Sequence, residues 1–308
     1  NHVATHRTRY TNAHLPAGVF IENRWRGQFI PTVTYFAGGY HDPFVIRKDD
    51  AIAALTAIWK AVYKTAPPAD IDGAVYAVTK QRLAEWRSGF GSAAIAMLAN
   101  LFTDADINQE IGRRVFADSL LDNNDFLYAN PGAKTGRGLF RSPLILQIFA
   151  SHFIAIRGHA YVSPQLGIEA SQFNAKGALA LSVTSTEYAL RLAAEGNLKF
   201  DEEGDSVSVK GKRKKLAAVA TTLNKSTGKE SKTATGFNEG NWGTIAQKYM
   251  VSVNNLSDDS FNAIVDAAQH IARSNNRGRQ STTTAGGDDE EEDARALLID
   301  ECNVFPTV

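Results

Sequence analysis

The densest group of chemically capable side chains is a basic run of five cations within six residues. The run consists of Lys210, Lys212, Arg213, Lys214 and Lys215. Clustered lysine and arginine side chains contact phosphates and release counterions from nucleic acid, and such a run also serves as a nuclear localisation signal. A solvated loop without any partner has the same composition. We expect these five residues to form a nucleic-acid-binding site, and the other two interpretations stay open.

An acidic tract near the end of the sequence opposes the basic run. Residues 285–301 hold eight acidic residues and one arginine, whereas residues 205–232 hold eight basic residues and two acidic ones. The local charges are therefore −7 and +6, although the 33 basic and 33 acidic residues of the whole chain cancel. The tract is expected to compete with nucleic acid for the basic run, to recruit a basic partner, or only to keep the protein in solution.

Scattered carboxylates offer a second kind of chemistry. Several aspartates would support metal-dependent hydrolysis if they converged on a divalent ion, and they are Asp42, Asp104, Asp106, Asp118, Asp122 and Asp125. Many of these residues stand where helix caps are expected. The phosphate-binding P-loop, the dinucleotide glycine motif, HExxH, GxSxG and the calcium-binding loop are all missing from the sequence. We expect no catalytic residue, no metal and no cofactor, and a metal-dependent hydrolase remains the alternative.

The histidines and the cysteine favour structural positions. His152 and His159 are two helical turns apart, and no cysteine or carboxylate stands at a spacing that would complete a metal site, so we expect core or helix-end histidines. Cys302 is the only cysteine, which excludes an intramolecular disulfide and indicates a reducing intracellular compartment, nuclear or cytoplasmic. No apolar run is long enough to span a bilayer, and the first residues lack the apolar segment of a signal peptide.

Hydrophobic periodicity predicts an all-α fold of about eight helices with extended arms at both ends and little β structure. The expected helices begin at Asp49 or Asp50, Asp72, Ser92, Asp104 or Asp106, Ser142, Ala175, Asn238 or Asn241, and Ser257. Ser142 followed by Pro143 is typical of a helix start. Residues 143–158 are apolar nearly all round, so this helix is expected in the middle of the core. Trp242 and Tyr249 lie at helical spacing, which favours core packing over base stacking.

Four local patterns lead to further expectations. Residues 28–36 are β-branched and aromatic, and Pro31 within them indicates an edge strand or an extended arm. The pair Ser88–Gly89 is expected to end the second helix. Residues 205–211 alternate and are expected to form a short hairpin arm. The fourth helix should bury one stripe made of Ile107, Ile111, Val115, Phe116 and Leu120.

The composition along the chain suggests three parts. We expect an N-terminal arm over residues 1–24, a helical domain over 25–274, and a linker, acidic tract and C-terminal arm over 275–308. A Gly- and Pro-rich loop at 130–141 is a possible subdivision, and residues 205–236 are expected to be a basic flexible insert.

Several runs of sequence resemble a known group of proteins. The runs are WRGQFIPTVTYFAG, YAVTKQRLAEWRSGFGSAAI, GLFRSPLILQIFASHF, KGALALSVTSTEYALRLAAEG and NKSTGKESKTATGFNEGNWG. Together they are similar to a multi-copy family of uncharacterised proteins from mushroom-forming, or basidiomycete, fungi, related to a fungal domain of unknown function. The resemblance covers roughly residues 24–274. It implies a eukaryotic intracellular protein, and it brings no catalytic residues with it.

These observations lead to three hypotheses about function. The first is a non-enzymatic intracellular interaction protein that associates with nucleic acid, chromatin or another polyanion through the basic run. The second is a self-assembling structural or coat-like subunit, in which terminal arms are exchanged within a homo-oligomer. The third is the metal-dependent hydrolase. None of them involves a membrane.

Overall fold

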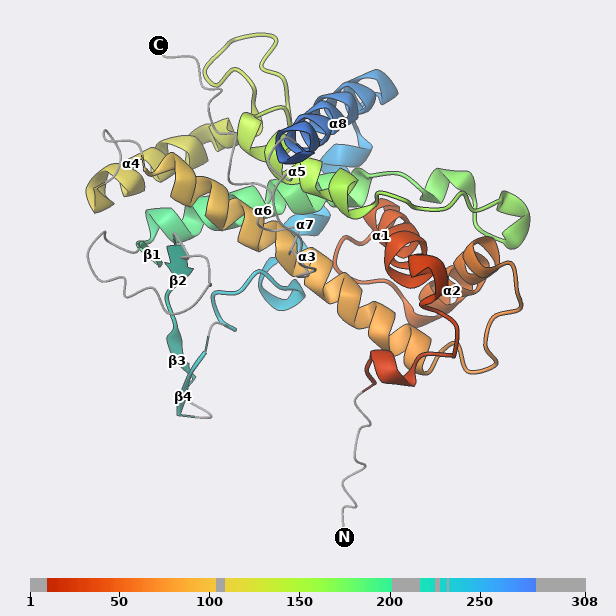
Figure 1. Ribbon diagram of the computed structural model, residues 1–308. Helices are drawn as coiled ribbons and strands as arrows, with labels where there is room; N and C mark the ends of the chain where they lie inside the picture. Colours follow the sequence, from red (N-terminus) through yellow and green to blue (C-terminus); the bar gives the residue numbers. More distant parts are fainter. Residues whose placement is uncertain (1–9, 104–108, 201–216, 225–227, 232, 281–308) are drawn as a thin grey trace.

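The computed structural model describes residues 10–103, 109–200, 217–224, 228–231 and 233–280. Eight α-helices occur in these ranges, as Figure 1 shows, which confirms the predicted all-α architecture with little β structure. They are α1 (Ile30–Gly39), α2 (Lys48–Tyr63), α3 (Ala74–Leu101), α4 (Glu110–Leu121), α5 (Pro143–Ala155), α6 (Lys176–Ala194), α7 (Glu239–Asn254) and α8 (Asp258–Gln280). No described helix combines the length and the apolarity that a bilayer crossing requires.

Two predicted caps are confirmed in atomic detail. The Ser142 hydroxyl accepts a hydrogen bond from the backbone N–H of Ile145, and Pro143 occupies the first position of α5. The Asn238 side chain accepts from the N–H of Asn241 at the start of α7. Each cap satisfies an N–H that the first helical turn leaves without an intrahelical partner.

Helix α6 is the centre of the fold, and not α5 as the sequence suggested. All but three of its 19 residues are buried, and it packs against α1, α3, α4, α5 and α7. Ser182, Thr184 and Thr186 tolerate this burial because each hydroxyl donates to a backbone carbonyl one turn back in the same helix. Because these side chains are polar, the hydrophobicity of the sequence does not reveal how completely α6 is buried.

The core consists of two clusters that share α3. The first half of α3 contributes Val75 and Leu83 to a cluster with α1 and α2. Its second half contributes Phe90 and Leu98 to a cluster around α5, α6, α7 and α8. Trp86 packs against both clusters. Part of the expected N-terminal arm joins the first cluster, where Leu15 and Val19 are buried.

The expected strand or extended arm at residues 28–36 is wrong, because these residues are helical. A short π-helix (Trp25–Phe29) runs directly into α1, and Pro31 stands in the first turn of α1, where a missing N–H disrupts little. Thr32 is completely buried, and its hydroxyl donates to the carbonyl of Gln28 and accepts from the N–H of Ala160. Tertiary burial therefore overrides the β preference of this segment.

The expected break at Ser88–Gly89 is also wrong, because α3 is continuous over 28 residues. Ser88 and Ser92 are accommodated because their hydroxyls donate to the carbonyls of Glu85 and Ser88. A side chain at Gly89 would meet nothing within 4 Å, so this glycine is not required by close packing.

Helix α4 packs only part of the expected stripe against the core. Ile111 and Val115 are 77% and 62% exposed, whereas Ala117 is fully buried and Phe116 and Leu120 pack against the core. Ile107 lies outside the described residues. The expectation is therefore confirmed for Phe116 and Leu120 and wrong for Ile111 and Val115, because α6 packs against α4 on the side of Ala117.

The strands form two antiparallel pairs, of which the second extends away from the helices (Figure 1). β1 (Leu198–Phe200) pairs with β2 (Ala217–Val219), and β3 (Thr222–Asn224) pairs with β4 (Lys229–Ser231). Residues 205–211, where a hairpin arm was expected, lie outside the described residues.

Candidate nucleic-acid interface and a pocket with a buried arginine

The basic run belongs to the connection between β1 and β2. Lys210, Lys212, Arg213, Lys214 and Lys215 all lie outside the described residues, which resume at Ala217. The strands on either side are paired, with Leu198 opposite Val219 and Phe200 opposite Ala217. Because these partners are adjacent, the chain enters and leaves the basic segment at one place on the surface.

The root of this segment is fixed to the core. Leu198 is buried in the cluster around α6, and the N–H of Asn197 donates to the carbonyl of Leu192 at 2.8 Å. The carbonyl of Asn197 accepts a hydrogen bond at 2.9 Å from the N–H of Ala220, the residue that directly follows β2. Both sides of the connection are therefore anchored next to the C-terminal end of α6.

A second hairpin follows and returns the chain to the helices. In β3 and β4, Leu223 lies opposite Glu230, and Figure 1 shows this pair extending away from the helical body. Lys229 is exposed on it. The side-chain amide of Asn241 then donates to the carbonyls of Thr233, Ala234 and Gly236, which ties the returning segment to α7.

The candidate metal-binding aspartates do not come together. Asp42 accepts from the N–H groups of Phe44 and Val45 in its own turn, and Asp125 forms an ion pair with Arg137. Asp118 and Asp122 lie at the end of α4, while Asp104 and Asp106 lie outside the described residues. Within the part of the chain that the structure describes, no three His, Cys, Asp or Glu side chains are grouped to hold a metal.

His152 is a core residue, as expected, and its surroundings are unusual. The side chain is completely buried on α5 among Trp86, Phe149 and Phe153, and neither ring nitrogen has a hydrogen-bond partner. Burial, with a smaller contribution from the charge of His159, lowers its pKa to about 3. The imidazole is therefore neutral at physiological pH.

The structure adds a pocket that sequence reasoning missed. It is a cavity of about 170 Å³ between α1, α2 and α3, closed on one side by the connection between α1 and α2. Its walls are mostly apolar and include Val33, Phe36, Phe44, Leu55 and Leu83. Thr79, Lys80 and Arg87 line it from one face of α3, and Glu239 lines it from the start of α7.

Arg87 is the most unusual group in this pocket. Its Nε donates to the carbonyl of Pro43 at 2.8 Å, but its buried Nη2 has no hydrogen-bond partner. Burial lowers its pKa to about 10, an effect that the charges of Asp42 and Glu239 partly offset. Among the described residues, no carboxylate forms an ion pair with it. The residue as a whole is half-buried, and its guanidinium carbon lies 5.9 Å from the centroid of the Trp86 ring. Burying the Nη2 end of a cation is costly unless a hydrogen-bonding group pairs with it.

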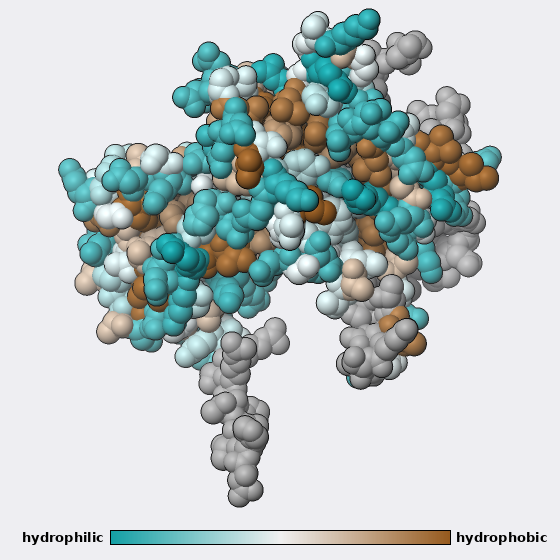
Figure 2. Space-filling view, turned by 180° about the vertical axis from the view of Figure 1, so that it is seen from behind, coloured by the Kyte–Doolittle hydropathy of each residue, from teal (hydrophilic) through white to brown (hydrophobic). Residues whose placement is uncertain are grey.

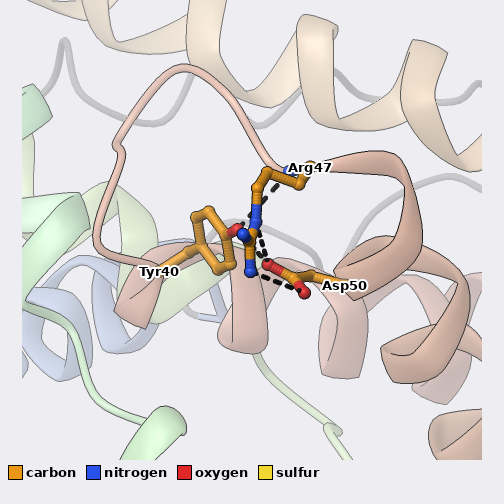
Figure 3. Close-up of polar contacts among 3 residues, drawn as sticks. All are labelled: Tyr40, Arg47 and Asp50. Carbon is orange, nitrogen blue, oxygen red and sulfur yellow. Dashed lines mark hydrogen bonds and ion pairs between the residues drawn. The ribbon is translucent and has the colours of Figure 1, made fainter.

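Three side chains hold the connection that closes the pocket (Figure 3). The Tyr40 hydroxyl and the Arg47 guanidinium both donate to the carboxylate of Asp50, with 2.9 Å between Arg47 Nε and Asp50 Oδ2. These hydrogen bonds keep the pKa of Asp50 below its ordinary value. We call these three residues the clasp. It joins the two ends of residues 41–46, which carry the pocket-lining side chains of Phe44 and Ile46.

Comparison with known families identifies the chain at the level of a domain. The model of a domain of unknown function, DUF6532, matches residues 32–204, which is more than half of the 308 residues, and the chain therefore belongs to this family. No curated protein and no solved structure matches it. The match contains Thr79 and Arg87 and ends before the basic run. It confirms the expected relation to a domain of unknown function over a shorter range than the resemblance covered.

Proposed function

We propose that the protein is a non-enzymatic interaction protein that binds nucleic acid, or another polyanion, through the segment between β1 and β2. Five cations in six residues carry the proposal. Clustered cations release counterions from a phosphate backbone without any need for a shaped cavity. The expected intracellular and fungal setting belongs to the same proposal.

The strand pairing around the segment supports this assignment. Leu198 and Val219 hold its two ends together against the core, so the basic residues are attached to a fixed root. The segment begins after Phe200 and ends before Ala217, which lie opposite each other in the β1–β2 pair. A polyanion bound there would not have to displace a core element.

The test is the salt dependence of binding to a fluorescently labelled double-stranded DNA, measured by anisotropy. We expect the wild-type affinity to fall steeply with salt. Replacing Lys212, Arg213, Lys214 and Lys215 by alanine should weaken binding and reduce the slope of log K against log salt by about 3 to 4, because each lost phosphate contact contributes about 0.9 to the slope.

The control removes the same charge elsewhere. Lys60, Lys64, Lys248 and Arg273 are exposed cations on helices, and their replacement by alanine should leave most of the affinity intact. Binding that survives the first set of substitutions unchanged, or that falls equally with the control set, would show that the basic run is not the site.

One observation favours self-assembly as a second candidate function. Ile111 and Val115 are one turn apart on α4 and largely exposed, which is uncommon for large apolar side chains on a helix. On the face shown in Figure 2, hydrophilic side chains divide the hydrophobic surface into small patches. Light scattering of the purified protein tests self-assembly. An oligomer that dissociates when Ile111→Ser and Val115→Ser are introduced would support this function. A protein that stays monomeric at high concentration would exclude it. Val251→Ser, at an equally exposed position on α7, is the control.

A further inference from the structure

The pocket between α1, α2 and α3 combines apolar walls with two unsatisfied polar groups. The hydroxyl of Thr79 and Nη2 of Arg87 are both buried and have no hydrogen-bond partner. Thr79 itself is only 3% exposed. Buried polar groups in proteins are nearly always hydrogen-bonded, so two unpartnered groups lining one cavity indicate that a ligand completes them.

The charges around the pocket favour a monoanion. Lys80 and Arg87 contribute two positive charges to the lining, and Glu239 contributes one negative charge. Asp42 is not part of the lining; its negative charge acts on Arg87, but its carboxylate accepts two backbone N–H groups and forms no ion pair with that guanidinium. Guanidinium groups pair with carboxylates through strong, charge-assisted hydrogen bonds. A ligand carboxylate at the buried Nη2 of Arg87 would supply the ion pair that no carboxylate of the described residues forms with this guanidinium.

The positions of the two groups on α3 favour an elongated ligand. Thr79 and Arg87 are eight residues apart on α3, with Leu83 midway between them, so all three share one face of the helix. At a rise of 1.5 Å per residue, their backbones are about 12 Å apart. The space between them is lined by Val33, Phe36, Leu55 and Leu83. An apolar cavity of about 150 Å³ is known to hold benzene, so a cavity of about 170 Å³ has room for a short hydrocarbon chain.

We propose that this pocket binds a medium-chain hydroxy-carboxylic acid. The carboxylate pairs with Arg87, the chain lies along Leu83, and the hydroxyl group at the other end bonds with Thr79. This site is independent of the basic run and lies, apart from Glu239, within the residues that the family model matches.

Isothermal titration calorimetry with three eight-carbon probes tests the proposal. We expect 8-hydroxyoctanoate to bind the full chain more tightly than octanoate does, and 1,8-octanediol to bind at least about tenfold more weakly because it lacks the charge. Arg87→Met should weaken both acids about tenfold. Thr79→Val should erase the difference between hydroxyoctanoate and octanoate.

Matched variants separate recognition from folding. Arg82→Met removes a half-buried cation that pairs with Glu85 on the same helix and does not line the pocket, and it should leave binding unchanged. Ala51→Leu fills the pocket from a half-buried position and should abolish binding of all three probes. If Arg87→Met fails to fold, Arg87→Lys keeps the charge but not the planar guanidinium, and it should still weaken both acids.

Three results would overturn the proposal. The first is absence of binding by either acid at millimolar concentration. The second is equal binding of the diol and the acids, or acid binding that the Arg87 and Ala51 variants leave intact. The third is a preference for the hydroxylated acid that persists in Thr79→Val, which would move the hydroxyl contact away from Thr79.

Discussion

The α-carbon of Gly38 on α1 lies directly against the imidazole of His152 on α5. A Cβ at position 38 would come within 2.5 Å of Cε1 and 2.9 Å of Nε2 of that ring. The ring has little room to retreat, because Trp86, Phe149 and Phe153 surround it. Glycine is therefore required here for close packing between the two helices.

Gly38→Ala should lower the free energy of unfolding by about 1 to 3 kcal/mol, the usual cost of overpacking a core. Chemical denaturation followed by circular dichroism measures the change. Gly89→Ala is the matched control, since a Cβ there meets nothing within 4 Å and alanine favours the helix. A Gly38→Ala protein as stable as the wild type would mean that α1 and α5 can move apart.

The buried neutral His152 should make stability fall as the pH is lowered. Its folded pKa of about 3 lies below the ordinary value of 6.5, so the unfolded chain binds the extra proton between these two values. Stability is then complete above about pH 6.5 and declines by up to about 1.4 kcal/mol per pH unit below it. Comparing urea denaturation of wild type and His152→Leu across pH 4–7.5 isolates this contribution.

The replacement of His152 should flatten the pH dependence. His270→Leu, which changes an exposed histidine on α8, should keep the wild-type slope. If His152→Leu has the same pH dependence as the wild type, the imidazole becomes protonated in the folded protein.

The starts of α5 and α7 show how much of the structure could be predicted from the sequence. Ser142 and Asn238 were identifiable as caps because capping depends on residues within one turn. The helical state of residues 28–36 was not, because it depends on burial of Thr32 against Ala160, which is 128 residues away. The sequence therefore predicted local capping interactions, but not the packing between residues that are far apart in the chain.

The pocket was beyond sequence reasoning for the same reason. Its only trace in the sequence is the spacing of Thr79, Leu83 and Arg87, which puts a hydroxyl and a cation on an otherwise apolar face of α3. The same pattern occurs at the boundary between the apolar and polar faces of any amphipathic helix. Only the packing of α1 and α2 against α3 shows that these residues line a pocket. The basic run, in contrast, was evident from composition alone, and whether it binds nucleic acid stays a prediction.

Tyr249 should contribute to stability through Glu187, a buried carboxylate on α6. The phenol donates to Glu187 Oε2 at 2.6 Å, while Arg191 pairs with Oε1 at 2.7 Å. Burial and the carboxylate both raise the pKa of Tyr249, so it remains a donor at any moderate pH. Tyr249→Phe should cost about 1 to 3 kcal/mol because the carboxylate loses a partner. Thermal denaturation of both variants measures these costs. Tyr161→Phe, at a 77% exposed position, is the control and should cost almost nothing.

Breaking the clasp should loosen the connection between α1 and α2. Asp50→Asn removes the charge that draws Tyr40 and Arg47 together. We expect faster amide hydrogen exchange in residues 41–46, measured by mass spectrometry, with little change elsewhere. Asp49→Asn, one residue earlier in the same helical turn, should leave that exchange unchanged; equal acceleration in both variants would point to the helix start and not to the clasp.

Removing the acidic tract should strengthen polyanion binding. Deletion of residues 285–301 takes away eight acidic residues, which we expect to compete with nucleic acid for the basic run. The labelled-DNA assay at low salt should show a higher affinity, and the gain should shrink as salt screens the charges. An affinity that does not change would indicate that the tract only maintains solubility.

The continuity of α3 has a mechanical consequence. Its 28 residues form a strut of about 42 Å that is built into both hydrophobic clusters, with Trp86 at the junction. A force that pulls one cluster apart is transmitted along this strut to the other, so neither cluster can yield alone. In single-molecule stretching, the body should therefore rupture in one step, and a helix-breaking proline at Gly89 should split that step into two.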